Sequence, residues 1–166
     1  MNIRLATTKD LDLIVQIIDA ARQLMQKNGN TTQWINGYPS KEVLLNDILL
    51  EHGFVCEYNN KIVGYFGFLK GNNPEPTYTL LENGAWLNEM PYGVVHRLAS
   101  NGTVKGVAKA CFDYCFSQIE NVRVDTHRDN QPMQNFLRNY GFKHCGTIYV
   151  ADGSPRDAFQ MEVNNS

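Results

Sequence analysis

Apolar residues near the start of the chain recur first with strand spacing and then with helical spacing. Ile3 to Ala6 predicts a short strand, and the threonine pair after it can cap the helix that follows. The apolar positions of this helix lie three or four residues apart: Leu11, Ile14, Ile18, Ala21 and Met25. Asn28-Gly29 ends the helix, and Ser40 is the expected N-cap of a second helix that ends near Leu50.

The next apolar runs predict a β-hairpin. In F-V-C-E-Y-N-N-K-I-V-G-Y-F-G-F-L, two β-rich runs flank Asn59-Asn60, a pair that tolerates the positive φ of a tight turn. Gly71 to Met90 is largely polar and contains prolines, so we expect a long excursion with little regular structure. Tyr92 to Ser100 returns to a strand pattern.

The second half of the chain alternates strands with helices. Gly106 to Glu120 carries apolar residues on nearly every side, which predicts a helix buried against a sheet. A strand over Val122 to Thr126 and a helix closed by Gly141 follow. Two final strands, Phe142 to Val150 and Arg156 to Val163, are joined by the turn sequence D-G-S-P. Since repeats and linkers are absent from the sequence, we predict one mixed α/β domain over residues 1–166.

Composition narrows the class of protein. Hydrophobic residues make up 43% of the 166 positions and charged residues 19%, which is typical of a globular chain. The formal net charge of −2 argues against a nucleic-acid binder, whose surface is usually strongly basic. No apolar run approaches the roughly 18 residues that cross a bilayer, and the first residues do not resemble a signal peptide. We expect a cytoplasmic protein that binds neither nucleic acid nor membrane.

The cysteines raise the question of a zinc site. Cys111 and Cys115 would share a helical face, and His144-Cys145 lies further along. Zinc ligands usually occur with C-x-x-C or H-x-x-x-H spacing, and neither spacing is present. We therefore expect buried, reduced thiols that act as small apolar residues, and no bound metal.

The segment L-A-S-N-G-T-V-K-G-V-A-K-A, Leu98 to Ala110, has glycines between a predicted strand and a predicted helix. The first N–H groups of a helix lack internal partners and attract anions, and Gly106 lets a ligand approach the backbone. Lys105 and Lys109 add positive charge, and Ala108 is small. Taken alone, the glycines are explained by default as an ordinary structural turn, and neither the P-loop nor the dinucleotide fingerprint is present.

A second motif strengthens the interpretation of the glycine loop as a ligand-binding segment. T-V-K-G-V-A, Thr103 to Ala108, matches the last half of [R/Q]-x-x-G-x-[G/A], and N-Q-P-M-Q-N-F-L-R-N-Y-G-F, Asn130 to Phe142, echoes N-x-x-A-x-x-[L/F]-Y-x-x-x-G-F. Both motifs, in this order and at this separation, resemble the GNAT superfamily of acyl-CoA-dependent N-acetyltransferases. Thr103 stands where that family usually has Arg or Gln, and Leu137 stands where many members have a tyrosine that protonates the leaving thiolate.

The resemblance implies a GNAT-like fold and a binding site for acetyl-CoA. The fold would be a central, mostly antiparallel mixed sheet of six to seven strands flanked by about four helices. A bulge would splay the strand at Leu98, Ala99 and Ser100, so that the Leu98 N–H bonds the thioester oxygen and the strand edge pairs with pantetheine. Asn130 would bond the far end of the pantetheine arm. The phosphates would meet the backbone of the loop and first helical turn: Thr103, Val104, Lys105, Gly106, Val107, Ala108 and Lys109.

An amine that arrives as ammonium needs a base. His96 and Tyr92 share a face of the predicted strand with one another, and histidine is a residue type that suits general-base catalysis. A half-buried histidine bonded within the sheet is the alternative for His96, while a phenol with a pKa of about 10 is a poor base. Trp34 and Tyr38 lie in the loop where the family lines its acceptor pocket, and they could equally cover the core.

Three functions follow from these observations. The first is an N-acetyltransferase that moves an acetyl group from acetyl-CoA to a small-molecule or peptide amine. The second is a non-catalytic acyl-CoA sensor, which Leu137 suggests, and the third is an α/β protein-interaction module without cofactor. A monomer and a homodimer both remain open, because exposed strand edges in this fold often pair.

Overall fold

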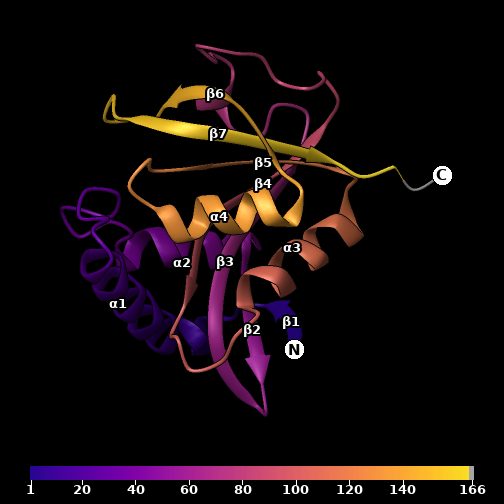
Figure 1. Cartoon of the computed structure of the whole chain (residues 1–166). Coiled ribbons are helices and arrows are strands. Elements are labelled where there is room, and N and C mark those ends of the chain that lie inside the picture. Colours follow the sequence, from indigo (N-terminus) through magenta and orange to yellow (C-terminus); the bar gives the residue numbers. More distant parts are fainter. Residues whose placement is uncertain (165–166) are drawn as a thin grey trace. The chain divides into compact units, whose positions relative to one another are not determined.

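A computed structural model describes residues 1–164, and within them the chain forms a mixed α/β fold of seven strands and four α-helices. The predicted fold class is confirmed. The strand order in the sheet is β1-β2-β3-β4-β5-β7-β6 (Figure 1). The strands are β1 Asn2–Leu5, β2 Gly53–Tyr58, β3 Lys61–Gly71, β4 Tyr92–Ser100, β5 Asn121–Thr126, β6 Lys143–Tyr149 and β7 Pro155–Glu162. The α-helices are α1 Leu11–Lys27, α2 Lys41–Leu49, α3 Val107–Gln118 and α4 Gln131–Tyr140.

The chain divides into two compact units, which we describe separately. The first unit comprises residues 1–68 and 95–114, and the second comprises residues 69–94 and the chain from Cys115 onward. Strand β4 and helix α3 each begin in one unit and end in the other.

Strands β2 and β3 give the first unit two different faces, because successive side chains of a strand point to opposite sides. Val55 and Tyr65 belong to the core that α1 and α2 cover, where Ile14, Ile18 and Leu44 are also buried. On the other face, residues of β2 and β3 pack against an aromatic side chain of α3: Phe54, Phe66, Phe68 and Tyr114. The alternating pattern thus produces a sheet with α1 and α2 on one face and α3 on the other.

The turns follow the sequence signals. Asn59 and Asn60 join β2 to β3 with φ of 50° and 61°, as expected for the hairpin. Asn28 caps the end of α1, and Gly29 takes φ of 86°. The start of α1 differs from the prediction, because a 3-10 turn over Thr8–Asp10 precedes it.

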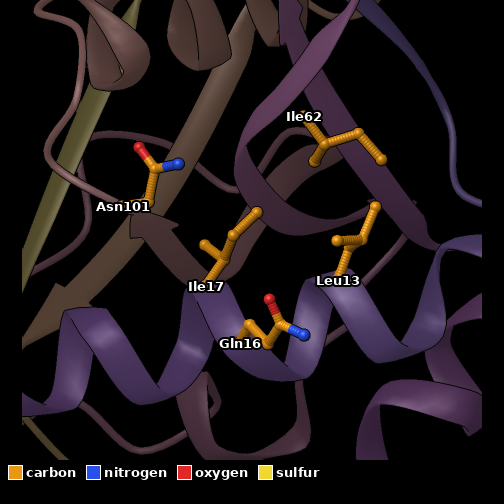
Figure 2. A pocket seen from close by; sticks show the side chains of 5 residues that line it. All are labelled: Leu13, Gln16, Ile17, Ile62 and Asn101. Carbon is orange, nitrogen blue, oxygen red and sulfur yellow. The ribbon is translucent and has the colours of Figure 1, made fainter.

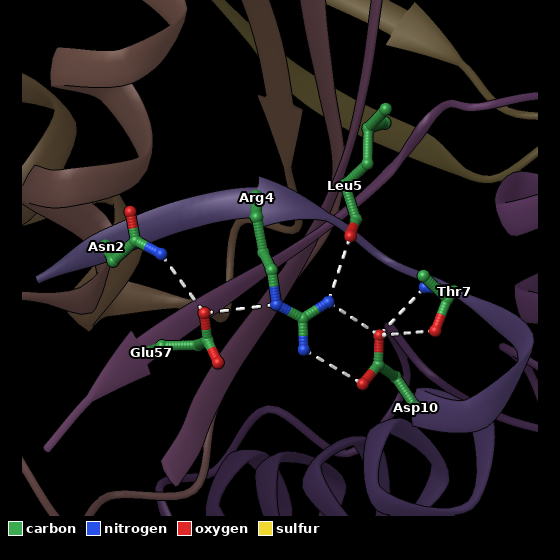
Figure 3. A network of polar contacts seen from close by, with 6 residues as sticks. All are labelled: Asn2, Arg4, Leu5, Thr7, Asp10 and Glu57. Atoms are coloured by element: carbon green, nitrogen blue, oxygen red, sulfur yellow. Dashed lines mark hydrogen bonds and ion pairs between the residues drawn. The ribbon is translucent and has the colours of Figure 1, made fainter. Parts of the chain in front are cut away.

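That 3-10 turn is tied to the sheet by Arg4 (Figure 3). Arg4 donates from Nη1 and Nη2 to both carboxylate oxygens of Asp10, at 2.8 and 3.0 Å, and from Nε to Glu57 at 3.0 Å. The Thr7 N–H also donates to Asp10 at 2.8 Å. Hydrogen bonds from Arg4 lower the pKa of the Asp10 carboxyl against the opposing effect of burial.

The second unit encloses its own core. Strands β5, β7 and β6 pair antiparallel, and β4 pairs with β5 in parallel at Gly93 and Val94. The long excursion before β4 contains only a short 3-10 turn among its described elements, as predicted, and it supplies Tyr78 and Trp86 to the core. Arg123 lies between the Trp86 and Tyr92 rings, about 4.2 and 4.1 Å from their centroids.

Two further sequence expectations concern buried thiols and membranes. All four cysteines are buried, as predicted: Cys56, Cys111, Cys115 and Cys145. Among residues 1–164, no cluster of three or more His, Cys, Asp or Glu side chains is arranged to hold a metal ion. None of the helices described in that range is long and apolar enough to span a bilayer.

Candidate active site

Strand β4 changes conformation at Arg97. This residue has φ of 55°, in the left-handed region that a residue with a side chain rarely adopts, whereas its neighbours in β4 are part of a strand. A left-handed residue inside a strand is typical of a bulge, which turns the next N–H away from the regular ladder. The next residue is Leu98, so the irregularity lies directly before the N–H that the sequence resemblance assigns to the thioester oxygen.

The loop after β4 is held by its own side chains. The Gly102 N–H donates to Ser100 Oγ at 3.1 Å, and the Thr103 N–H and Oγ1 both donate to Asn101 Oδ1, at 3.0 and 2.7 Å. Gly102 and Gly106 have φ of 78° and 94°. Thr103, which replaces the family's usual Arg or Gln, thus contributes to the turn itself.

Helix α3 begins at the end of this loop. Its first intrahelical hydrogen bond runs from the Ala110 N–H to the Gly106 carbonyl, at 3.0 Å. The N–H groups of Val107, Ala108 and Lys109 precede that bond and are the donors that a helix N-terminus offers to an anion. A Cβ on Gly106 would meet no atom within 4 Å, so the backbone surface is open there. These features suit the phosphates of CoA.

The start of α3 is fixed against the sheet by a close contact in the first unit. Gly64 of β3 has no Cβ, and a Cβ there would lie 2.6 Å from Cγ1 of Val107 and 3.1 Å from the Ala99 carbonyl oxygen. The absence of a side chain at Gly64 therefore lets the first residue of α3 pack directly on β3.

The side chain of Arg97 enters a buried polar network. Its Nε and Nη2 donate to both carboxylate oxygens of Asp47 in α2, at 2.8 and 2.6 Å, and its Nη1 donates to the Tyr38 oxygen at 3.0 Å. The Tyr65 hydroxyl also donates to Asp47, at 2.6 Å. Burial lowers the pKa of the Arg97 guanidinium, but the hydrogen bonds and charge interactions with Asp47 and Tyr38 together outweigh it, so the pKa is raised. Burial raises the pKa of Tyr65, which keeps the phenol a donor.

A cavity of about 240 Å³ lies beside the loop that follows β4. Leu13, Gln16 and Ile17 of α1 line it together with Ile62 of β3 and Asn101 (Figure 2). Asn101 is shared between this cavity and the turn that holds Thr103, so a change at Asn101 alters both.

The profile of the Acetyltransferase (GNAT) family matches residues 19–142 of the chain. The chain belongs to the GNAT acetyltransferase family. None of the curated proteins compared with it gives a significant match. The family match covers the strand, loop and helix of the candidate site.

Solved structures support the same assignment. A GNAT-family acetyltransferase from Streptococcus agalactiae 2603 is 28% identical, with a TM-score of 0.89, and the match covers 99% of this chain and 96% of that one. A GNAT-family acetyltransferase from Listeria monocytogenes 4b F2365 is 18% identical, with a TM-score of 0.70 and coverage of 98% and 94%. A ribosomal-protein-alanine N-acetyltransferase from Brucella melitensis is 16% identical, with a TM-score of 0.65 and coverage of 98% and 100%. The last two show the fold alone.

In this member of the GNAT family the residues predicted for the acceptor pocket occupy different environments. Trp34 is 7% exposed and belongs to the buried core cluster of the first unit, and its place in an acceptor pocket stays a prediction. Tyr38 is 41% exposed, and its hydroxyl oxygen accepts the bond from Arg97. His96 is half-buried in β4, next to Arg97.

Other predicted residues lie in the second unit. Asn130 caps α4, since its Oδ1 accepts from the Met133 N–H at 3.2 Å. Leu137 is fully buried in α4. Tyr92 is 2% exposed beside Tyr78 and Arg123, and burial raises its pKa, so even less of the phenolate form is present near neutral pH than the sequence suggests.

No motif in the sequence indicates the network of Arg97, Asp47 and Tyr65. Arg97 and Asp47 are 50 residues apart, and neither lies in a motif. One signal is present, because Asp47 stands in the largely apolar run L-L-N-D-I-L-L, and a buried aspartate there is expected to need a cationic partner.

Proposed function

We propose that this chain transfers an acetyl group from acetyl-CoA to an amine. The observation that carries the proposal is the left-handed Arg97 directly before Leu98, followed by a glycine loop that opens onto the N-terminus of α3. Strand irregularity, open backbone and helix N-terminus thus occur in one stretch, and each suits a different part of the thioester cofactor.

The reaction requires a neutral amine and a polarised carbonyl. The amine nitrogen attacks the thioester carbon, a C–N bond forms, the C–S bond breaks, and the amine loses a proton while CoA leaves as the thiolate. A backbone N–H aimed at the carbonyl oxygen stabilises the negative charge that develops on it. Loss of one such donor typically costs about 10²- to 10³-fold in rate.

Each part of the cofactor has proposed partners in the first unit. The Leu98 N–H bonds the thioester oxygen, and the β4 edge at Ala99 and Ser100 pairs with pantetheine. The backbone from Thr103 to Lys109 binds the phosphates. Asn130, which belongs to the second unit and caps α4, stays a prediction as a pantetheine ligand.

His96 is the proposed base. It precedes Arg97 in β4, and a neutral imidazole can accept the proton of an amine through a ring nitrogen. Tyr92 is the weaker alternative because its phenol is buried. Tyr38, from the loop between α1 and α2, is the proposed contact to the acceptor.

The acceptor we propose is a small-molecule or peptide amine. We further propose that residues 1–166 form one N-acetyltransferase domain that acts in the cytoplasm without a metal. A homodimer and a monomer are both compatible with this activity.

A labelled acetyl transfer assay tests the function. The purified chain is incubated with ¹³C-acetyl-CoA and a panel of polyamines, amino acids, aminoglycosides and peptide N-termini, and products are detected by mass. We expect one class to gain the labelled acetyl group, and His96→Ala to lower its turnover. If CoA raises the melting temperature but no amine is acetylated, the chain is a sensor. If CoA also leaves the melting temperature unchanged, the cofactor assignment is wrong.

A further inference from the structure

The strongest polar feature of the first unit is the clamp between Arg97 and Asp47. Both side chains are buried, with 13% and 7% of their surfaces exposed, and the planar guanidinium meets both carboxylate oxygens. Such a forked pair fixes direction as well as distance, which a single lysine ammonium cannot do. The Tyr65 hydroxyl holds the same carboxylate from β3.

Two glycines make room for this clamp. Gly53 of β2 and Gly67 of β3 are direct cross-strand partners. A Cβ on Gly53 would lie 3.1 Å from Tyr65 Oη, and a Cβ on Gly67 would lie 3.3 Å from the His96 carbonyl oxygen and 3.5 Å from Arg97 Nη2. Strands β2 and β3 therefore carry no side chain at the two positions that lie against Tyr65 and Arg97.

The clamp acts on a strained backbone. Arginine avoids positive φ, so the conformation at Arg97 persists only because its surroundings hold it. The bonds from its side chain to Asp47 anchor the far end of the residue in α2. The remaining guanidinium nitrogen, Nη1, binds Tyr38 in the loop between α1 and α2.

We infer that Asp47 is a positioning residue for acetyl transfer, which it serves by holding Arg97 in the left-handed conformation that orients the Leu98 N–H. Through Arg97 Nη1 the same carboxylate also fixes the Tyr38 hydroxyl. Asp47 touches neither the cofactor nor the acceptor in this scheme. The inference rests on the proposed function, because it assigns a supporting role for the same N–H.

A comparison of kcat with acetyl-CoA and the Kd of CoA distinguishes this positioning role from a general loss of structure. Free CoA has no thioester carbonyl, so its affinity does not depend on the Leu98 N–H. We expect Asp47→Asn to lower kcat with acetyl-CoA about 10- to 100-fold, short of the full loss of an oxyanion donor, while the Kd of CoA stays within about twofold. A parallel loss of CoA affinity and kcat, or an unchanged kcat, would overturn the inference.

Substitutions of Arg97 test the backbone directly. Glycine adopts φ of 55° without strain, whereas alanine does not. We therefore expect Arg97→Gly to retain more turnover than Arg97→Ala, although both lack the guanidinium. Equal kcat values for the two variants would show that the conformation at position 97 does not matter.

A second Asp–Arg pair in the same unit, in which Asp10 is buried and Arg4 is partly exposed, serves as the control. Asp10→Asn breaks the bond to Arg4 and is expected to reduce stability while leaving kcat unchanged. If Asp47→Asn does not fold, Tyr65→Phe removes one bond to Asp47 and is expected to lower kcat in the same direction by a smaller factor, again without weakening CoA. An unchanged kcat in Tyr65→Phe and an equal kcat in the two Arg97 variants would then overturn the inference. A wild-type chain that acetylates no amine would instead refute the proposed function.

Discussion

Gly64 of β3 and Val107 of α3 pack so closely that no side chain fits between them. A Cβ on Gly64 would lie 2.6 Å from Cγ1 of Val107, much closer than two carbon atoms approach in a folded protein. The first residue of α3 is therefore set against the sheet by a missing side chain. Since the N–H groups that follow are the proposed phosphate donors, this contact fixes where those donors lie.

Replacement of Gly64 by alanine should disturb both stability and cofactor binding. The added methyl group must displace α3, and overpacking of this kind costs about 1–3 kcal/mol of unfolding free energy. We expect Gly64→Ala to lower the melting temperature and to weaken CoA binding in a titration. The double variant Gly64→Ala/Val107→Ala removes Cγ1 and should recover most of the CoA affinity. If the double variant binds CoA no better than the single one, the contact does not position the loop.

Gly106 should tolerate no side chain when CoA is bound. A Cβ there would stand in open space, but a residue with a Cβ is strained at φ of 94° and obstructs the approach of the phosphates. We expect Gly106→Ala to weaken CoA at least about tenfold, or ~1.4 kcal/mol, and Gly106→Val to weaken it further. Gly29→Ala is the matched control, since Gly29 has φ of 86° and equally open surroundings at the end of α1. An equal loss of CoA affinity in both alanine variants would contradict the phosphate assignment.

For the substitution Leu137→Tyr, the structure predicts a different effect from the one that the sequence motif suggests. From the motif alone, Leu137→Tyr would restore the family's tyrosine, raise turnover and leave the fold unchanged. The structure places Leu137 at 0% exposure, so a tyrosine must overpack the core. We expect Leu137→Tyr to lose about 1–3 kcal/mol of unfolding free energy in a denaturant titration, whereas Leu137→Met stays near wild type. A Leu137→Tyr chain as stable as wild type would show that the site can open to receive a phenol.

The bond from Arg4 makes stability depend on pH through Asp10. Because the pKa of Asp10 is lowered in the folded chain, the carboxylate favours folding at neutral pH. This contribution is fully present above the unfolded pKa of about 3.9 and is lost as the pH falls through the lower folded-state pKa. We expect Asp10→Asn to be less stable than wild type at pH 7 in urea titrations, with a difference that shrinks below about pH 4. A difference that grows in acid would contradict the assignment.

Local signals in the sequence predicted the elements of the fold. Asn59-Asn60 marks a hairpin and Gly141 ends a helix because few residues adopt positive φ, so short stretches of sequence carry this information. Alternation in β2 and β3 likewise separates the face under α1 and α2 from the face that contacts Tyr114. The glycine loop before α3 was recognised for the same reason.

Pairings between distant residues could not be predicted. Arg97 of β4 takes a conformation that arginine avoids, and its side chain pairs with Asp47 of α2, which is 50 residues away in the sequence. The burial of Trp34 and Leu137 depends on which segments pack over them. The residue type alone does not predict it, because tryptophan and leucine occur both in pockets and in cores. The cavity beside Asn101 is made by α1, β3 and the loop together, and none of these segments indicates it alone.

The central claim is that the backbone after the left-handed Arg97 binds CoA, and amide NMR tests it most directly. In a ¹⁵N-labelled chain titrated with CoA and then with acetyl-CoA, we predict shifts of the amides of Val104 to Lys109 with both ligands. The Leu98 amide should shift further with acetyl-CoA, because only the thioester offers it a carbonyl oxygen. The hairpin amides of Asn59 and Asn60 should stay in place. Unmoved amides from Val104 to Lys109 at saturating CoA, or a Leu98 amide that responds identically to both ligands, would contradict the account.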